Sequence, residues 1–284
     1  MILTVATATW NVAKTSGLDG LVRCIESVAR LKTPHEHLIF DGGSQDGTLD
    51  VLLDMESRIE TLKVVSERDS GIYNALNKAV RSAQGEWFNV LGSDDYISHP
   101  ETLDRILAET PNDVDVIVAQ SEVAGVADGF YFDRIHISTP YCHQGVFAKT
   151  VLVRSLGGFD ERYKVSADFD MMLKWHERGC NIRYVNEPIA FFAKGGFCQK
   201  SGGALGHENL KIAADHFGLN ERERRRLERY SVIPIRVVKR HLSHPDAALR
   251  KGARYMRRRY YLSYLMSVFY PVVVARRWLL GKSR

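Results

Sequence analysis

The stretch from Trp87 to Ile97, WFNVLGSDDYI, combines a buried strand with a cluster of acidic residues. Its first half is an apolar run, and its second half is a Gly-Ser turn followed by the adjacent carboxylates Asp94 and Asp95. A hard cation such as Mg²⁺ takes oxygen ligands and usually shares its coordination with the phosphates of a substrate. The stretch is therefore a candidate metal site, although Ser and Asp also favour turns and could simply begin a loop.

Three similar units precede this stretch. Apolar runs at 2–9, 37–40 and 61–67 predict strands, and helical spacing of apolar residues predicts helices at 18–31, 49–58 and 71–83. Strands that alternate with helices in this way are typical of a parallel sheet covered by helices on both faces. The sequence therefore predicts an α/β fold.

Polar side chains follow each of the four predicted strands. Asn11 follows the first, Asp41 the second, Glu67 to Asp69 the third, and the Asp94–Asp95 pair the fourth. Ligands in open parallel sheets bind beyond the carboxyl ends of the strands, so we expect a binding site at this edge. No GxGxxG motif follows the first strand, which argues against a dinucleotide-binding domain.

The second half of the chain carries another acidic motif. We expect a helix at 101–109, a strand at 114–121, mixed or edge strands within 122–140, and helices at 148–156 and 168–178. The last helix begins at SADFD, so Asp168 and Asp170 are either functional carboxylates or helix caps. His143, in PYCHQG, is either a substrate contact or a hydrogen-bonded structural residue.

Composition bounds the class of protein. The 284 residues are 45% hydrophobic and 26% charged, which fits one large α/β domain with or without a tail. The four cysteines form no CxxC pair, so the sequence supports neither a zinc site nor a redox motif. ILTVATATW after Met1 resembles a strand rather than a secretory leader, and we expect a cytoplasmic location.

The C-terminal region is basic and helical in pattern. Within 254–280, aromatic and aliphatic residues are flanked by arginines, and the apolar part is shorter than the roughly 20 residues of a spanning helix. This pattern predicts an interfacial helix on an anionic membrane surface, and a packed helical hairpin or homodimer contact is the alternative. No nucleic-acid-binding module is recognised, so we expect no nucleic-acid partner.

Taken together, the motifs resemble a known family. They are TATWN at 7–11, DGGSQDGT at 41–48, SERDSGIYNALNKAVRSAQGEW at 66–87, LGSDD at 91–95, HQGVF at 143–147 and GGFDERYKVSADFDMML at 157–173. In this order the chain resembles inverting family 2 glycosyltransferases of the bacterial exopolysaccharide and colanic acid branch over about 1–199. The resemblance implies a GT-A fold, with a Rossmann-like, mostly parallel sheet in a catalytic domain at 1–205 and a basic helical region at 206–284.

The resemblance also implies residue roles. Asp168 matches the proposed catalytic base, and Asp94, supported by Asp95, would hold a divalent metal, Mn²⁺ or Mg²⁺. The implied nucleotide and substrate contacts are Thr9, Asn11, Asp41, Glu67, Arg68, Asp69, Gly71, Asn74, Ser93 and His143. One position departs from the family pattern: the first residue of the DXD metal motif is Gly92, which removes one carboxylate.

The implied activity is transfer of a sugar, with inversion, from a nucleotide diphosphate sugar, UDP-linked by expectation. The acceptor would be a glycan or a polyprenyl-linked molecule at the inner face of the cell membrane, in cell-surface polysaccharide biosynthesis. Because of Gly92, the alternative is a catalytically degenerate GT-A protein that binds a nucleotide or serves as a scaffold in a membrane glycan-assembly complex.

Overall fold

The computed structural model describes residues 1–123, 125–193, 203–231 and 233–258. By its internal contacts the chain divides into two units. Unit 1 comprises Met1–Phe130 and Tyr141–Glu208, and unit 2 comprises Tyr131–Pro140 together with the chain from Asn209 onward. The sequence pattern gave no sign that a segment from the middle of the chain belongs with the C-terminal region.

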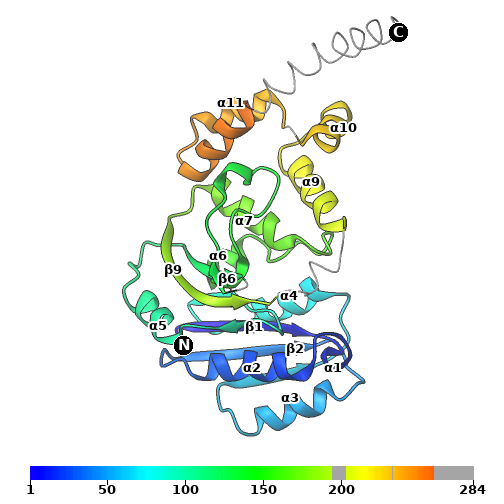
Figure 1. Cartoon of the computed structure of the whole chain (residues 1–284), viewed down its shortest axis with the longest axis vertical. Helices are drawn as coiled ribbons and strands as arrows, with labels where there is room; N and C mark the ends of the chain where they lie inside the picture. Colours follow the sequence, from blue (N-terminus) through cyan, green and yellow to red (C-terminus); the bar gives the residue numbers. More distant parts are fainter. Residues whose placement is uncertain (124, 194–202, 232, 259–284) are drawn as a thin grey trace, which may run out of the picture. The chain divides into compact units, whose positions relative to one another are not determined.

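The first half of unit 1 alternates strands and helices as predicted (Figure 1). The elements are β1 (Leu3–Thr9), α1 (Val12–Thr15), α2 (Leu18–Ala29), β2 (His35–Asp41), α3 (Thr48–Glu56), β3 (Leu62–Ser66), α4 (Ile72–Ser82) and β4 (Trp87–Val90). The four strands are parallel, in the order β3-β2-β1-β4. The predicted parallel sheet is therefore confirmed.

Strand register brings the polar strand ends together. Thr9 pairs with Asp41 across β1 and β2, and Asp41 pairs with Ser66 across β2 and β3. Ala6 pairs with Val90, so β4 ends beside β1 and the LGSDD turn begins at the same edge. The carboxyl ends of all four strands thus meet where the sequence places its acidic residues.

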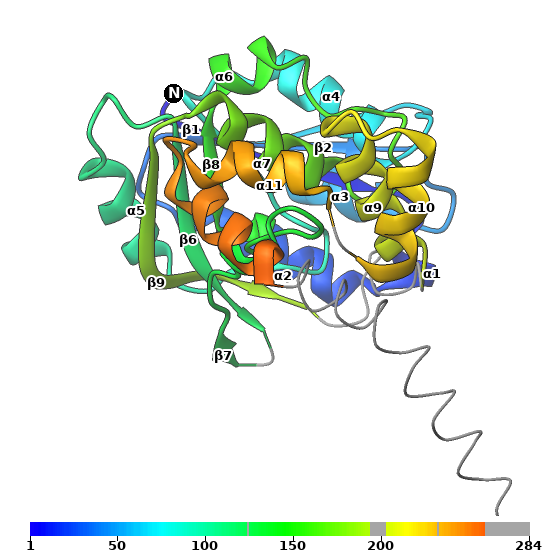
Figure 2. The same cartoon turned by 90° about the horizontal axis from the view of Figure 1, so that it is seen from above.

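The second half of unit 1 extends the sheet with mixed strands (Figure 2). Its elements are β5 (Tyr96–Ile97), α5 (Pro100–Ala108), β6 (Val116–Val123), β7 (Val126–Ala127), β8 (Val146–Lys149), α6 (Thr150–Ser155), α7 (Ala167–Arg178) and β9 (Ile182–Phe192). β8 is antiparallel to both β4 and β6, and β9 is parallel to β6. The sheet order continues from β4 as β8-β6-β9-β5.

Two expectations about residues 122–156 are confirmed only in part. The helix predicted from 148 begins at Thr150, because residues 146–149 form strand β8. Within 122–140 the sequence predicts mixed or edge strands. The end of β6 and the two-residue strand β7 (Val126–Ala127), which pairs antiparallel with β6, agree with this prediction. Phe132–Arg134, which belongs to unit 2, is instead a short 3₁₀ helix. The aromatic residues that suggested strands there do not secure sheet pairing without a partner edge.

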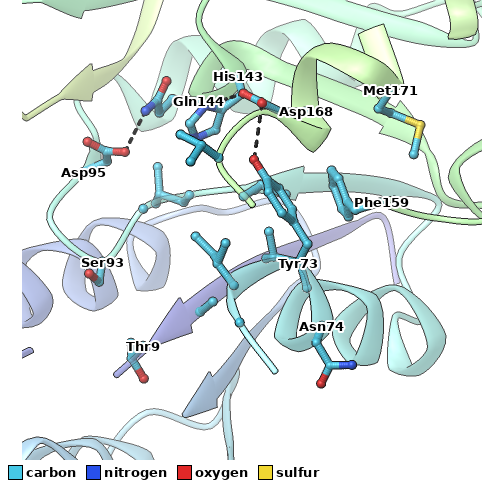
Figure 3. A pocket seen from close by; sticks show the side chains of 18 of the residues that line it. Thr9, Tyr73, Asn74, Ser93, Asp95, His143, Gln144, Phe159, Asp168 and Met171 are labelled. Carbon is cyan, nitrogen blue, oxygen red and sulfur yellow. Dashed lines mark hydrogen bonds and ion pairs between the residues drawn. The ribbon is translucent and has the colours of Figure 1, made fainter. Parts of the chain in front are cut away.

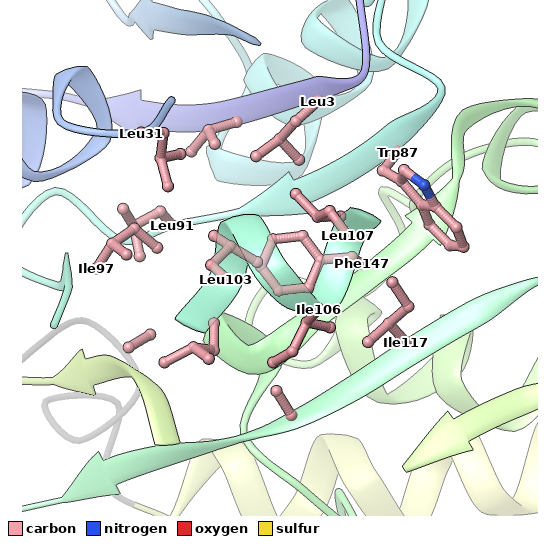
Figure 4. Packing of buried hydrophobic residues seen from close by; sticks show 14 of the residues in the cluster. Leu3, Leu31, Trp87, Leu91, Ile97, Leu103, Ile106, Leu107, Ile117 and Phe147 are labelled. Atoms are coloured by element: carbon pink, nitrogen blue, oxygen red, sulfur yellow. The ribbon is translucent and has the colours of Figure 1, made fainter. Parts of the chain in front are cut away.

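Helices cover both faces of the sheet in unit 1 (Figure 1). α4 packs on β1 and β2, and α2 packs against β2 and β5. One hydrophobic core joins β1, β4, α5, β6 and β8 through side chains that include Leu3, Trp87, Leu103, Ile117 and Phe147 (Figure 4). Burial of this apolar surface holds the strand ends in fixed register.

Unit 2 is helical. It contains α9 (Ala204–His216, whose first residues belong to unit 1), α10 (Glu221–Tyr230), α11 (Ile235–Leu242) and helical residues 247–258. Asn220 caps α10 in a capping box with Glu223. None of the helices in the described ranges is long and apolar enough to cross a membrane. Most of the predicted interfacial segment, from 259 on, lies outside the described residues, as do the Gly-rich residues 194–202.

Candidate functional site

A cavity of about 560 Å³ opens at the carboxyl ends of β1 and β4. It extends between α4 and α7 and is lined by residues of both helices. It is bordered by most of the predicted site residues: Thr9, Asp69, Gly71, Asn74, Ser93, Asp94, Asp95, His143 and Asp168. A neighbouring pocket of about 350 Å³ is lined by Trp10, Asn11, Gly42, Gly43, Gln45, Arg68 and Asp69. Of the predicted residues, Asp41 and Glu67 line neither.

Asp41 holds the strand-end loops together. It is 1% exposed, and its carboxylate accepts hydrogen bonds from the backbone N–H groups of Gly43 (3.1 Å) and Ser44 (2.9 Å). The hydroxyls of Thr9, Ser44 and Ser66 also donate to it. A carboxylate with this many donors from its own chain fixes the shape of the neighbouring pocket, because each bond constrains a different loop.

Asn11 and Asp69 also support the loops around this pocket. The Asn11 side-chain oxygen accepts from Gln45 N–H at 2.9 Å, and Asn11 itself adopts a left-handed backbone conformation with φ of 48°. Asp69 accepts from Gly71 N–H at 2.9 Å. A Cβ on Gly42 would lie 2.8 Å from Asp69 Oδ2, so glycine allows Asp69 to stand between the two pockets.

Two predicted contacts are engaged elsewhere in the protein. Glu67 forms an ion pair with Lys78 at 2.8 Å. The side-chain amide of Asn74 donates to Glu161 at 3.1 Å, and Ser70 and Asn77 donate to the same carboxylate. The hydrogen bonds from Asn77, Asn74 and Ser70 outweigh burial, which acts in the opposite direction, and lower the pKa of Glu161. Glu161 therefore stays ionised and joins α4 to the loop before α7.

Asp94 and Asp95 differ sharply although they are adjacent. Asp95 is 3% exposed. Its oxygens accept from Gln144 Nε2 at 2.7 Å (Figure 3) and from Ala193 N–H at 2.8 Å. Burial raises the pKa of Asp95 above its usual range, against the opposing effect of these bonds. Asp94 is partly exposed and borders the cavity, so it is the carboxylate available to a ligand.

The glycine at position 92 has a packing reason. A Cβ at Gly92 would lie 2.5 Å from Asp95 Oδ2, inside the closest distance that real Cβ contacts show. Asp95 is fixed by Gln144 and Ala193, so it cannot easily give way. A carboxylate at position 92 and the observed Asp95 therefore exclude one another.

The donor set allows a metal that draws most of its ligands from the substrate. Within the described residues, no group of three or more His, Cys, Asp or Glu side chains is arranged to hold an ion. Of the two adjacent carboxylates in LGSDD, Asp94 is the open one, and Mg²⁺-type ions are commonly bound by one or two carboxylates plus phosphate oxygens and water. This chain thus fits a cation that is bound together with a diphosphate.

Asp168 stands in the first turn of α7 at the cavity wall. Its Oδ1 accepts from Phe169 N–H at 2.9 Å, and the Tyr73 hydroxyl donates to the same oxygen at 3.4 Å. His143 Nδ1 lies 3.5 Å from Oδ2 (Figure 3). The N-terminus of a helix carries a partial positive charge, so Asp168 lies in the turn of α7 that attracts negatively charged groups. Asp170, by contrast, is buried and pairs with Lys174 at 2.6 Å.

His143 responds to this carboxylate. Burial alone would lower the pKa of His143, but the hydrogen bond and charge of Asp168 outweigh burial and raise the pKa above its ordinary value. The charged ring therefore forms an ion pair with Asp168 over a wider pH range than a free histidine would.

Sequence reasoning missed three residues that shape this site. Tyr73 and Gln144 line the cavity, and Gln144 Oε1 is buried with no hydrogen-bond partner in the described part of the chain. Trp10 is 64% exposed and borders both pockets. Each lies inside a motif already noted, yet their roles depend on contacts with residues 30 to 100 positions away, which spacing alone does not reveal.

Sequence comparison matches residues 4–168 to Glycosyl transferase family 2. The chain belongs to this family. It is 31% identical over 182 residues to the PGL/p-HBAD biosynthesis glycosyltransferase of Mycobacterium bovis, covering 61% of this chain and 71% of that protein. It is 28% identical over 179 residues to the chondroitin synthase of Escherichia coli, covering 59% of this chain and 26% of the synthase.

Solved structures share the fold. TarS 1–349 of S. aureus in complex with UDP-GlcNAc aligns with a TM-score of 0.61 at 18% identity, over 90% of each chain. The mannosyltransferase PcManGT of Pyrobaculum calidifontis in complex with GDP-Man and Mn²⁺ aligns with the same TM-score at 18% identity, over 96% of this chain and 80% of that one. The predicted GT-A fold, the family and the transferase class are confirmed.

Proposed function

We propose that this glycosyltransferase moves a sugar from a UDP-sugar to the hydroxyl of a glycan or lipid-linked acceptor, with inversion at the anomeric carbon. The observation that carries the proposal is the shared cavity: the strand-end groups Thr9, Ser93 and Asp94 line the same space as the Asp168 carboxylate. One end can hold a donor and the other can receive the proton of an acceptor.

Asp168 is assigned as the general base. The acceptor hydroxyl gives its proton to the carboxylate while its oxygen bonds to the anomeric carbon, and the sugar–phosphate bond breaks with its electron pair going to the diphosphate. Attack from the face opposite the leaving group inverts the configuration and needs no covalent enzyme intermediate. A positioned carboxylate base typically contributes about 10²–10⁴-fold in rate. His143 and Tyr73 orient the carboxylate toward the cavity.

The nucleotide diphosphate is assigned to the strand-end edge. The pocket beside Trp10, Arg68 and Asp69 has an aromatic face, a cation and a carboxylate, which suit a base, its phosphates and a ribose. A divalent cation, when bound, neutralises negative charge that develops on the leaving diphosphate. Asp94 is its protein ligand in this proposal, with Asp95 restricted to holding the turn.

The acceptor and the cellular setting extend the proposal. A polyprenyl-linked acceptor at the inner face of the cell membrane fits an anionic-membrane contact by the 254–280 segment, and cell-surface polysaccharide biosynthesis fits both. A degenerate scaffold protein is the alternative. A Cβ at Gly92 would meet Asp95, so packing supplies a reason for the glycine other than loss of activity. The homodimer contact stays a prediction.

A thermal-shift screen with nucleotide sugars tests the donor assignment. A ligand at 100 times its Kd stabilises the folded state by about 2.7 kcal/mol, so UDP-sugars should raise the melting temperature. Mn²⁺ should add to the shift in the wild type and not in Asp94→Asn. A panel in which no nucleotide sugar shifts the transition would overturn the proposal, and a full Mn²⁺ effect in Asp94→Asn would remove the metal assignment.

A further inference from the structure

The cavity has two chemically different ends. Thr9, Ser93 and Asp94 form the polar end at the edge of the sheet. The other end, which we call the apolar chamber, is lined by buried side chains from α4, β4, α6, the loop after α6, and α7: Leu76, Phe88, Val153, Phe159, Met172 and Trp175. A nucleotide sugar and a glycan are both rich in hydroxyls, so neither explains why the cavity continues into this lining.

Several polar groups beside the apolar chamber already have partners. Trp175 Nε1 donates to the Tyr141 hydroxyl at 2.9 Å, and the Tyr73 hydroxyl donates to Asp168. A sugar ring placed here would bury hydroxyls without partners, which is unfavourable for each one. Methylene and aromatic groups have no hydrogen bonds to lose, and their transfer from water to the chamber is favourable. The chamber therefore selects an apolar group.

The apolar chamber is directly connected to the base. The Tyr73 ring stacks on Phe159, with centroids 5.7 Å apart, while the hydroxyl of the same side chain reaches Asp168. In Figure 3, Phe159 and Met171 lie on the side of Tyr73 away from Thr9 and Ser93. A group in the chamber thus shares a wall with Asp168, on the side of the cavity remote from the strand-end edge.

We propose that the apolar chamber binds the alkyl or aryl body of the acceptor, so that the reacting hydroxyl attached to this body meets Asp168. The inference rests on the proposed function and names its acceptor class: an alcohol with an apolar body next to the hydroxyl, rather than a free sugar. In the transfer, this hydroxyl loses its proton to Asp168 and its oxygen takes the sugar from the diphosphate.

An NMR titration tests the inference. It measures the binding of 1-butanol, 1-hexanol and 1-octanol to the full chain, with and without UDP. The Kd should fall by roughly fourfold for each methylene that the chamber buries. D-glucose, the polar control, should bind more weakly than octanol. Equal Kd values for the three alkanols, or tighter binding of glucose, would overturn the inference. UDP binding, measured in the same samples, reports separately on the proposed function.

Two variants of one helix locate the binding. Val153→Phe fills the chamber and should abolish the dependence on chain length, whereas Val151→Phe, at a position that is 71% exposed and outside the cavity, should leave it unchanged. Unaltered UDP affinity shows that Val153→Phe is folded. If it is not folded, Ala148→Val, at a buried residue of β8 that also lines the cavity, is the milder replacement. If a chamber-filling variant is folded and its alkanol Kd still depends on chain length as in the wild type, the inference is overturned. Octanol binding that persists with UDP but is displaced by an intact UDP-sugar would also overturn it, because the chamber would then hold part of the donor.

Discussion

Asp41 and Asp168 are both carboxylates beside the strand-end pockets, but the structure uses them differently. Asp41 is almost fully buried and accepts bonds from three hydroxyls and two backbone N–H groups. Asp168 has a side chain that is 21% exposed, and its side-chain neighbours Tyr73 and His143 stand at 3.4 and 3.5 Å. Asp41 therefore has its hydrogen bonds satisfied within the protein, whereas Asp168, in the first turn of α7, keeps a carboxylate accessible to a substrate.

The largest expected effect is on turnover in Asp168→Asn. The amide keeps the size of the side chain but cannot accept the acceptor proton, so kcat should fall by about 10²–10⁴-fold. Initial rates with the donor found by the binding screen measure it. The melting temperature should change little, because Asn can still accept from Phe169 N–H and the contacts of Asp168 with Tyr73 and His143 are long. Full activity in this variant would show that another group is the base.

Asp41→Asn should act mainly on stability. Replacing one acceptor oxygen by an NH₂ group opposes two donors in a buried cluster, which should lower the free energy of unfolding by about 2–4 kcal/mol. Urea denaturation measures the change. Asp54→Asn is the control, since its exposed pair with Arg58 should contribute at most about 1 kcal/mol. An equal decrease in the free energy of unfolding of the two variants would contradict the stabilising role assigned to the buried Asp41.

Gly92→Ala probes the packing reason for the missing carboxylate. The added Cβ meets Asp95, so the free energy of unfolding should fall by about 1–2 kcal/mol. Gly129→Ala is the matched control, because nothing lies within 4 Å of a Cβ at that position. If Gly92→Ala is as stable as its control, Asp95 is free to move and the two-carboxylate metal motif is not excluded by space.

Tyr73→Phe should have a smaller effect. It removes one long hydrogen bond to Asp168 and keeps the ring that stacks on Phe159, so kcat should fall by about two- to fivefold, equivalent to roughly 0.5–1 kcal/mol. Steady-state rates decide the size. A loss as large as that of Asp168→Asn would assign Tyr73 a part in the proton transfer itself.

The smallest expected effect is the pH dependence of the His143–Asp168 pair. The folded-state pKa of His143 is raised above its unfolded value, so the stability that the pair contributes is fully present below about pH 6.5 and is lost as pH rises through the folded pKa. The pair is partly exposed, so we expect roughly 0.5 kcal/mol. The free energy of unfolding of the wild type minus that of His143→Asn, measured as a function of pH, should decrease as pH rises. A difference that increases with pH would contradict the ion pair.

The sequence predicts the local features of this molecule well. Apolar runs located β1 to β4, and the polar residues after them correctly indicated one binding edge, because parallel strands end together. Helical spacing and an acidic first turn located α7 within one residue of its observed start. These features depend on neighbouring residues, which a pattern can capture.

Features that depend on distant contacts were not predictable. LGSDD does not reveal that Asp94 is open while Asp95 is buried, because the difference is made by Gln144 and Ala193. The strand β8 within the HQGVFAK segment exists because β4 and β6 offer edges on both sides. The apolar chamber likewise results from helices and strands that are brought together only in the folded chain.

The anomeric configuration of the first product tests the central claim most directly. ¹H NMR during turnover of an α-linked UDP-sugar reports the configuration of the product through the anomeric coupling constant. Asp168 acting as a base on the acceptor hydroxyl predicts a β-linked product in a single displacement. An α-linked product would require a different mechanism and would contradict the role assigned to Asp168.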